Sequence, residues 1–174
     1  LSICAKLHKT GHRRIAYLGN VGPGNNQTNE TDRVVTLVPI ARHLGLDLAD
    51  RTCTRFTGAP EEKELLRRWL TEDKITAIVV STNASFMNAH DLLRGEKTLR
   101  ARMPSFVAFD IWPLNARSDT PKLHGTITDR PTMGQLAFDW LNELVIKGCR
   151  PGEQGGKRVT PVIWQDGETL KPLS

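Results

Sequence analysis

The chain has 174 residues, of which 39% are hydrophobic and 25% charged, and its formal net charge is +5. This composition is typical of a globular protein and excludes a collagen-like or mostly disordered chain. No apolar run reaches the roughly 18–20 residues of a membrane-spanning helix, and the first residues lack a signal-peptide pattern. The basic residues are scattered among acids, so we expect no direct binding of nucleic acid by this chain and no contact with a membrane.

Hydrophobic periodicity predicts helices and strands that alternate along the chain. The expected helices cover 2–9, 28–44, 60–70, 86–93 and 131–147. The expected strands cover 14–18, 52–57, 75–81, 105–109, 125–128 and 159–164. Pro39 falls inside the second helix, where proline costs roughly 3 kcal/mol unless the helix kinks, and Pro161 places the last strand at a sheet edge.

The last predicted helix has a clear amphipathic pattern, since apolar residues recur at helical spacing. The residues expected to face inward are Leu136, Trp140, Leu141, Leu144 and Val145. Strands separated by helices of these lengths pair in parallel through right-handed crossovers. The sequence therefore predicts the α/β class, with a doubly wound and mainly parallel sheet.

Motifs for catalysis or for metal binding are absent from the sequence. It contains no GxGxxG opening a helix, no P-loop, no GxSxG and no HExxH. The cysteines Cys4, Cys53 and Cys149 are widely spaced without a CxxC pair, which indicates reduced thiols in a cytosolic protein. His12 stands beside two arginines and is expected at the surface. We expect no enzymatic activity, no catalytic residue, no metal and no cofactor.

Ligands of open parallel sheets bind beyond the carboxyl ends of the strands, and polar residues follow several predicted strands here. Asp110 directly follows an apolar strand and either accepts hydrogen bonds from a ligand or pairs with a turn or an arginine. Asn83 either contacts a ligand or caps a helix. Trp112 offers a flat face to a sugar or packs as an ordinary apolar residue. The planar fork of Arg33 holds two ligand oxygens or forms a surface ion pair.

Five segments, taken in order, resemble the LacI-type transcriptional regulators. The most specific is Gly-His-Arg-Arg-Ile-Ala-Tyr-Leu-Gly at 11–19, which is similar to a characteristic segment of that family. Weaker similarities follow in register at 32–46, 76–83, 104–110 and 133–141, so that the resemblance spans about residues 5–165. The sequence departs from the family pattern at Thr36 and Asn88, where glycine is usual, and at Pro39.

The resemblance implies a bilobed, periplasmic-binding-protein-like domain that binds a small effector, usually a sugar, in the cleft between its lobes. By motif, the family's ligand contacts fall on Arg33, on Thr82 or Asn83, and on Asp110. Residues 11–112 would form the C-terminal lobe, while 1–10 and 122–165 would be crossing segments and parts of an incomplete other lobe. The family's DNA-binding domain would precede this chain, which by itself would not bind an operator.

Two functions follow as expectations. The first is the effector-binding domain of a cytoplasmic, homodimeric repressor, in which the ligand biases the arrangement of the lobes and thereby the DNA binding of a separate domain. The alternative is a periplasmic solute-binding or sensor protein of the same fold.

Overall fold

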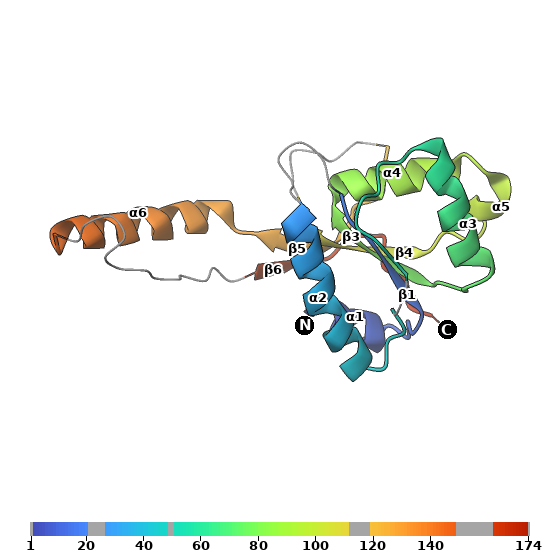
Figure 1. Cartoon of the computed structure of the whole chain (residues 1–174), viewed down its shortest axis with the longest axis horizontal. Helices are drawn as coiled ribbons and strands as arrows, with labels where there is room; N and C mark the ends of the chain where they lie inside the picture. Colours follow the sequence, from blue (N-terminus) through green and yellow to red (C-terminus); the bar gives the residue numbers. More distant parts are fainter. Residues whose placement is uncertain (1, 21–26, 49–50, 112–118, 149–161, 174) are drawn as a thin grey trace.

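The computed structural model describes residues 2–20, 27–48, 51–111, 119–148 and 162–173. A single six-stranded sheet runs through it in the order β2-β1-β3-β4-β5-β6 (Figure 1). The strands are β1 (Ile15–Leu18), β2 (Thr52–Cys53), β3 (Ala77–Thr82), β4 (Ser105–Asp110), β5 (His124–Thr128) and β6 (Val162–Gln165). Neighbouring strands pair in parallel except β5 and β6, which are antiparallel. The predicted fold class and the edge position of the last strand are therefore confirmed.

Helices cover both faces of the sheet between β2 and β4. In chain order the described helices are α1 (Ser2–Lys9), α2 (Gln27–His43), the 3-10 helix η1 (Pro60–Glu62), α3 (Lys63–Thr71), α4 (Asn83–Arg94), α5 (Lys97–Arg100) and α6 (Arg130–Ile146), the last of which does not pack on the sheet. Helices α1 and α2 lie on one face, and α3 and α4 lie on the other (Figure 1). The four-residue helix α5 was not predicted, because so short an element contains no hydrophobic period.

Alternate residues of β3 supply two separate apolar layers. Val79 packs on the α1–α2 side, while Ile78 and Val80 pack on the α3–α4 side, where Trp69 is fully buried. Burying each such side chain stabilises the fold by about 1.5–3 kcal/mol. Coverage of both faces explains why the strand is continuously apolar in sequence instead of alternating with polar residues.

Helix α2 continues through Pro39 without ending. Pro39 itself is exposed, whereas Leu37 and Ala41 on the opposite side of the helix are buried against the sheet. Burial of that side offsets the helix-breaking effect of the proline.

The strand predicted over 52–57 is only two residues long. The Glu62 carboxylate accepts hydrogen bonds from the backbone N–H groups of Thr57, Gly58 and Ala59, at 2.6–3.2 Å. Because these backbone N–H groups donate to Glu62, they are not available to a neighbouring strand, and the chain forms a turn where a longer strand was expected.

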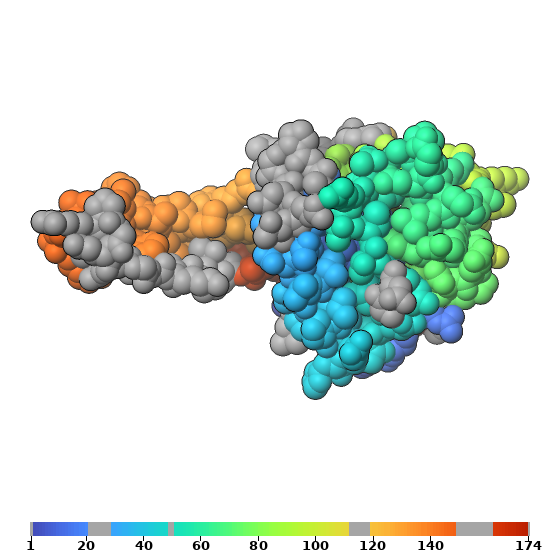
Figure 2. Space-filling model, viewed as in Figure 1, coloured from blue at the N-terminus to red at the C-terminus, as the bar shows by residue number. Residues whose placement is uncertain are grey.

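The prediction of an inward face on α6 is wrong for this structure. Helix α6 extends away from the main body at the end of an arm formed by β5 and β6 (Figures 1 and 2), and none of its residues is buried. Leu141 is 59% exposed and Val145 69% exposed, while Leu136, Trp140 and Leu144 are half-buried. The amphipathic pattern is present, but no surface in the described part of the chain packs against it.

None of the described helices combines the length and the apolar content that crossing a bilayer requires.

Two cysteines agree with the expectation of free thiols. Cys4 is buried and Cys53 is half-buried, and neither forms a disulfide. Burial raises the pKa of both thiols, which keeps them in the protonated, unreactive form. Cys149 lies outside the described residues.

His12 is fully buried, so the prediction of a surface histidine is wrong. Its Nδ1 lies 3.0 Å from Thr76 Oγ1, and its Nε2 lies 3.0 Å from the carbonyl oxygen of Lys171. The two flanking arginines are exposed, as expected. The His12 ring instead lies between Thr76, just before β3, and Lys171 in the C-terminal segment 166–173. Because a carbonyl oxygen only accepts, Nε2 carries a proton and donates to Lys171, and in the neutral ring Nδ1 accepts from the Thr76 hydroxyl.

We expect this contact to make the fold sensitive to acid. Burial lowers the pKa of His12 below its ordinary value of 6.5, so the protonated ring is less favoured in the folded than in the unfolded chain. The stabilisation is therefore complete above the unfolded pKa and is lost as the pH falls below it, by up to about 1.4 kcal/mol per pH unit. Urea unfolding from about pH 7.5 to about pH 5.5 measures the effect.

The variant His12→Gln should lose less stability over this pH range than the wild type. His43→Gln removes an exposed histidine at the end of α2 and serves as the matched control. Equal pH dependence of the wild type and His12→Gln would show that His12 is not the group responsible.

Candidate functional site

The carboxyl ends of β3, β4 and β5 bring several of the predicted ligand residues together. Thr82 and Asp110 are paired in register on the adjacent strands β3 and β4. Asn83 follows Thr82 as the first residue of α4. From β5, Thr128 Oγ1 donates a hydrogen bond of 3.3 Å to Asp110 Oδ1. This edge of the sheet is where ligands bind in open parallel sheets.

Asp110 has the arginine partner that the sequence left open as an alternative. Arg130 Nη2 lies 3.9 Å from Asp110 Oδ2, at the outer limit of an ion pair, and the Arg130 side chain is half exposed. Pairs that are long and solvent-exposed contribute between zero and about 1 kcal/mol. The carboxylate is thus held at the strand end by a weak ion pair and by the hydroxyl of Thr128.

Thr82, rather than Asn83, occupies the N-cap position of α4. Its backbone is extended, but its side chain does not cap the helix. Thr82 Oγ1 is buried and has no hydrogen-bond partner in the described part of the chain. Because more than nine in ten buried polar groups are hydrogen-bonded, an unpartnered hydroxyl needs an explanation such as a ligand or an ordered water. Asn83 is also buried, at 7% exposure.

Arg33 is held by a buried glutamate instead of forming a surface ion pair. Arg33 Nη1 lies 2.8 Å from Glu30 Oε1, and Tyr17 Oη donates a hydrogen bond of 2.5 Å to Glu30 Oε2. Glu30 is fully buried, while the Arg33 side chain is 25% exposed. The guanidinium is therefore fixed in orientation on a side chain that is partly exposed.

Tyr17 connects this cluster to the strand ends. Burial and the Glu30 carboxylate raise the pKa of Tyr17, so its hydroxyl stays protonated and remains a donor. The Tyr17 ring also packs edge-on against Phe109, with 6.0 Å between ring centroids. Since Phe109 immediately precedes Asp110, the cluster of Arg33, Glu30 and Tyr17 lies next to the end of β4.

Sequence reasoning missed the roles of Glu30 and Tyr17. Glu30 was expected only as part of the helix over 28–44, and Tyr17 only as part of the strand over 14–18. The available signal was the three-residue spacing between Glu30 and Arg33, which places them on one face of α2. Trp112, the fifth predicted ligand residue, lies outside the described residues.

The described residues contain no group of three or more histidine, cysteine or acidic side chains arranged to hold a metal ion. The side chains at the strand ends offer hydroxyl, amide, carboxylate and guanidinium groups, and these are suited to hydrogen bonding with a polar small molecule.

Comparison with protein families gives no match, and no curated protein sequence matches the chain. Solved structures, in contrast, share its fold. A LacI family transcriptional regulator from Bifidobacterium animalis subsp. lactis is 18% identical with a TM-score of 0.73, and the match covers 99% of this chain and 60% of that chain. One from Enterococcus faecium with bound ribose is 15% identical with a TM-score of 0.69, covering 99% and 62%. One from an Arthrobacter species in complex with lactose is 16% identical with a TM-score of 0.71, covering 97% and 62%.

These similarities confirm the predicted resemblance at the level of the fold. The chain has the α/β architecture found in LacI family transcriptional regulators, with a mostly parallel six-stranded sheet and flanking helices. It spans about 60% of the length of the structures that it matches.

Proposed function

We propose that the chain is part of the effector-binding domain of a LacI-type transcriptional regulator, and that it binds without catalysing a reaction. In this proposal the carboxyl edge of the sheet holds one side of a small hydroxyl-rich effector, a sugar or a similar metabolite. The observation that carries the proposal is the meeting of Thr82, Asn83 and Asp110 at one sheet edge, where the buried hydroxyl of Thr82 has no partner in the described chain. Arg33 is held beside the same edge by Glu30, and its side chain is partly exposed.

The proposal gives each group a role. The Asp110 carboxylate accepts hydrogen bonds from sugar hydroxyls, and the Asn83 amide can both donate and accept them. The Arg33 fork donates two parallel hydrogen bonds to neighbouring ligand oxygens, and Glu30 sets its orientation. The flat face of Trp112 would cover the apolar side of the sugar ring.

The arm formed by β5, β6 and α6 supports a bilobed arrangement. We assign residues 11–112 to one lobe, and residues 1–10 and 122–165 to the crossing segments and to parts of another lobe; of these, α1 and β5 pack on the sheet of the first lobe. Phe138, Leu141 and Val145 on α6 are 59–69% exposed, which is the surface that a second lobe would bury. An effector bound between the lobes would favour one arrangement of a homodimer and so control a separate DNA-binding domain in the cytoplasm.

A periplasmic solute-binding or sensor protein remains the second interpretation of the same fold. The similar solved structures favour the first, because those reported above are transcriptional regulators, two of them with a bound sugar.

The proposal is tested by titrating the isotope-labelled chain with ribose and with lactose and following amide shifts by nuclear magnetic resonance. We expect at least one of the sugars to shift the signals around 82–83 and 110, and Asp110→Asn to weaken binding about tenfold or more. Asp32→Asn, which changes an exposed carboxylate on the helix that carries Arg33, should leave the affinity unchanged. Shifts confined to other regions, or equal affinities of both variants, would refute the proposed site.

A further inference from the structure

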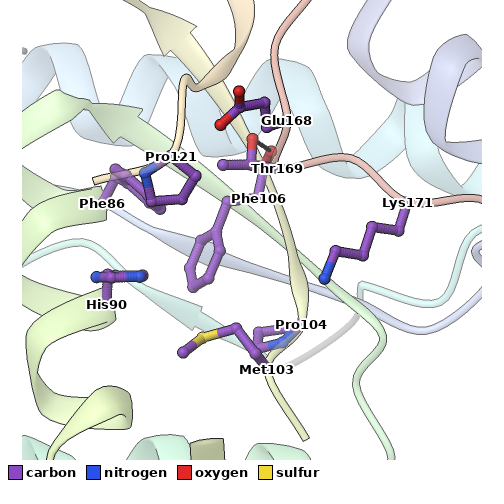
Figure 3. Close-up of a pocket in the computed structure, with 9 residues that line it drawn as sticks. All are labelled: Phe86, His90, Met103, Pro104, Phe106, Pro121, Glu168, Thr169 and Lys171. Atoms are coloured by element: carbon purple, nitrogen blue, oxygen red, sulfur yellow. Dashed lines mark hydrogen bonds between the residues drawn. The ribbon is translucent and has the colours of Figure 1, made fainter. Parts of the chain in front are cut away.

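A second concavity lies near the amino end of β4, on the face of the sheet that α4 covers (Figure 3). Its volume is about 90 Å³. Phe86 of α4 and Phe106 of β4 form its apolar floor, with their ring centroids 5.1 Å apart. Met103 and Pro104 close one side of it. Because it lies toward the amino end of β4, this concavity is distinct from the site at the carboxyl ends of the strands.

Two nitrogen-bearing side chains border this apolar space from opposite sides, His90 and Lys171 (Figure 3). His90 is 8% exposed, and its buried Nδ1 has no hydrogen-bond partner in the described chain. The nearest carboxylate oxygen, Asp91 Oδ1, lies 3.8 Å away, beyond hydrogen-bond distance. Burial lowers the pKa of His90, so the ring is mainly neutral at pH 7 and carries one proton to donate.

The backbone around Lys171 is firmly attached to β4. Lys171 N donates to Ser105 Oγ at 3.0 Å, and Thr169 Oγ1 donates to the carbonyl oxygen of Phe106 at 2.7 Å. The Lys171 side chain therefore extends along the cavity from a fixed point (Figure 3). The cavity also has one acidic side chain, Glu168, whose Oε2 accepts a hydrogen bond from the backbone N–H of Lys122 at 3.2 Å.

The size of the space limits what it can hold. About 90 Å³ is smaller than the ~150 Å³ cavity known to hold benzene. Because the exposed side chains of Glu168 and Lys171 border the concavity, it is open to solvent, so the short carbon chain of a ligand can pack on the two phenylalanine rings while its polar ends lie at the opening. An ammonium group and an imidazole N–H on opposite sides both require acceptors on the ligand.

We propose that this cavity binds a short aliphatic carboxylate that carries a second oxygen, such as a hydroxy acid of four carbons. Its carboxylate pairs with Lys171, its second oxygen accepts a hydrogen bond from His90, and its carbon chain packs on Phe86 and Phe106. The proposal does not depend on the effector site at the other end of the strands.

The test is a titration of the labelled chain with β-hydroxybutyrate, with butyrate and with butan-1-ol, followed through amide shifts at 86–90, 103–106 and 168–171. On the wild type we expect β-hydroxybutyrate to bind more tightly than butyrate, and butyrate more tightly than the uncharged alcohol. Lys171→Met should weaken binding of both acids about tenfold. Lys122→Met changes a lysine outside the cavity lining and should leave both affinities unchanged.

His90→Phe keeps a ring in contact with Phe86 and removes the donor, so it should abolish the preference for β-hydroxybutyrate over butyrate. The order of affinities of the three ligands for the wild-type chain tests the proposal even if this variant does not fold. The proposal is overturned if the alcohol binds as well as the acids, if the shifts lie elsewhere, or if Lys171→Met and Lys122→Met behave alike.

Discussion

Replacing Glu30 by alanine is expected to lower the free energy of unfolding by about 3–5 kcal/mol, the range found when one partner of a buried ion pair is removed. The change leaves the half-buried Arg33 guanidinium and the buried Tyr17 hydroxyl without the carboxylate that both contact. Glu64→Ala is the matched control, because Glu64 is 76% exposed and pairs with an exposed Arg67. It should cost less than about 1 kcal/mol. Urea unfolding monitored by circular dichroism measures both values.

A combined variant shows how much of the stability lost in Glu30→Ala comes from the groups left without a partner and how much from the loss of packing. Adding Arg33→Met and Tyr17→Phe to Glu30→Ala removes the groups left without an acceptor, so part of the lost stability should return. If Glu30→Ala costs no more than Glu64→Ala, then Glu30 does not hold Arg33 in the folded chain.

Gly19→Ala is expected to destabilise the chain by about 1–3 kcal/mol, the usual cost of overpacking a close-packed site. A Cβ at this position would lie 2.4 Å from Glu30 Oε2 and 2.7 Å from the carbonyl oxygen of Thr54. The Thr54 contact is with backbone, so relief requires a shift of the chain after β2.

Gly134→Ala is the control for this substitution. Gly134 lies in α6, and a Cβ added there would have no atom of a neighbouring group within 4 Å. Since glycine is unfavourable inside a helix, Gly134→Ala should stabilise the chain by up to about 1 kcal/mol. The two substitutions are thus expected to change the midpoint of thermal unfolding in opposite directions. A Gly19→Ala variant as stable as the wild type would contradict the close approach of Glu30 to β1.

The strands could be predicted well, because the physics that defines them is local. The apolar run that became β3 is visible from residues close together in sequence. The helices between successive strands are local signals too, and they predict the parallel pairing that the structure has. The same holds for the polar residues beyond the strand ends, since Thr82 and Asp110 were placed together by the rule for parallel sheets and are paired in register.

Other features depend on contacts between distant segments and could not be predicted in this way. His12 is buried because residue 171, far along the chain, runs beside it. The orientation of Arg33 depends on Tyr17 and on Glu30, which meet only when α2 packs on β1. The periodicity of α6 indicates that the helix needs an apolar partner, but a periodic pattern does not specify where that partner is.

The most direct measurement of the proposed role is a set of intermolecular nuclear Overhauser effects between the sugar that binds and the labelled chain. We predict effects from sugar ring protons to the side chains of Thr82 and Asn83 and to Arg33 Hδ. Effects confined to residues away from the carboxyl edge of the sheet would contradict a ligand held by Arg33, Thr82, Asn83 and Asp110.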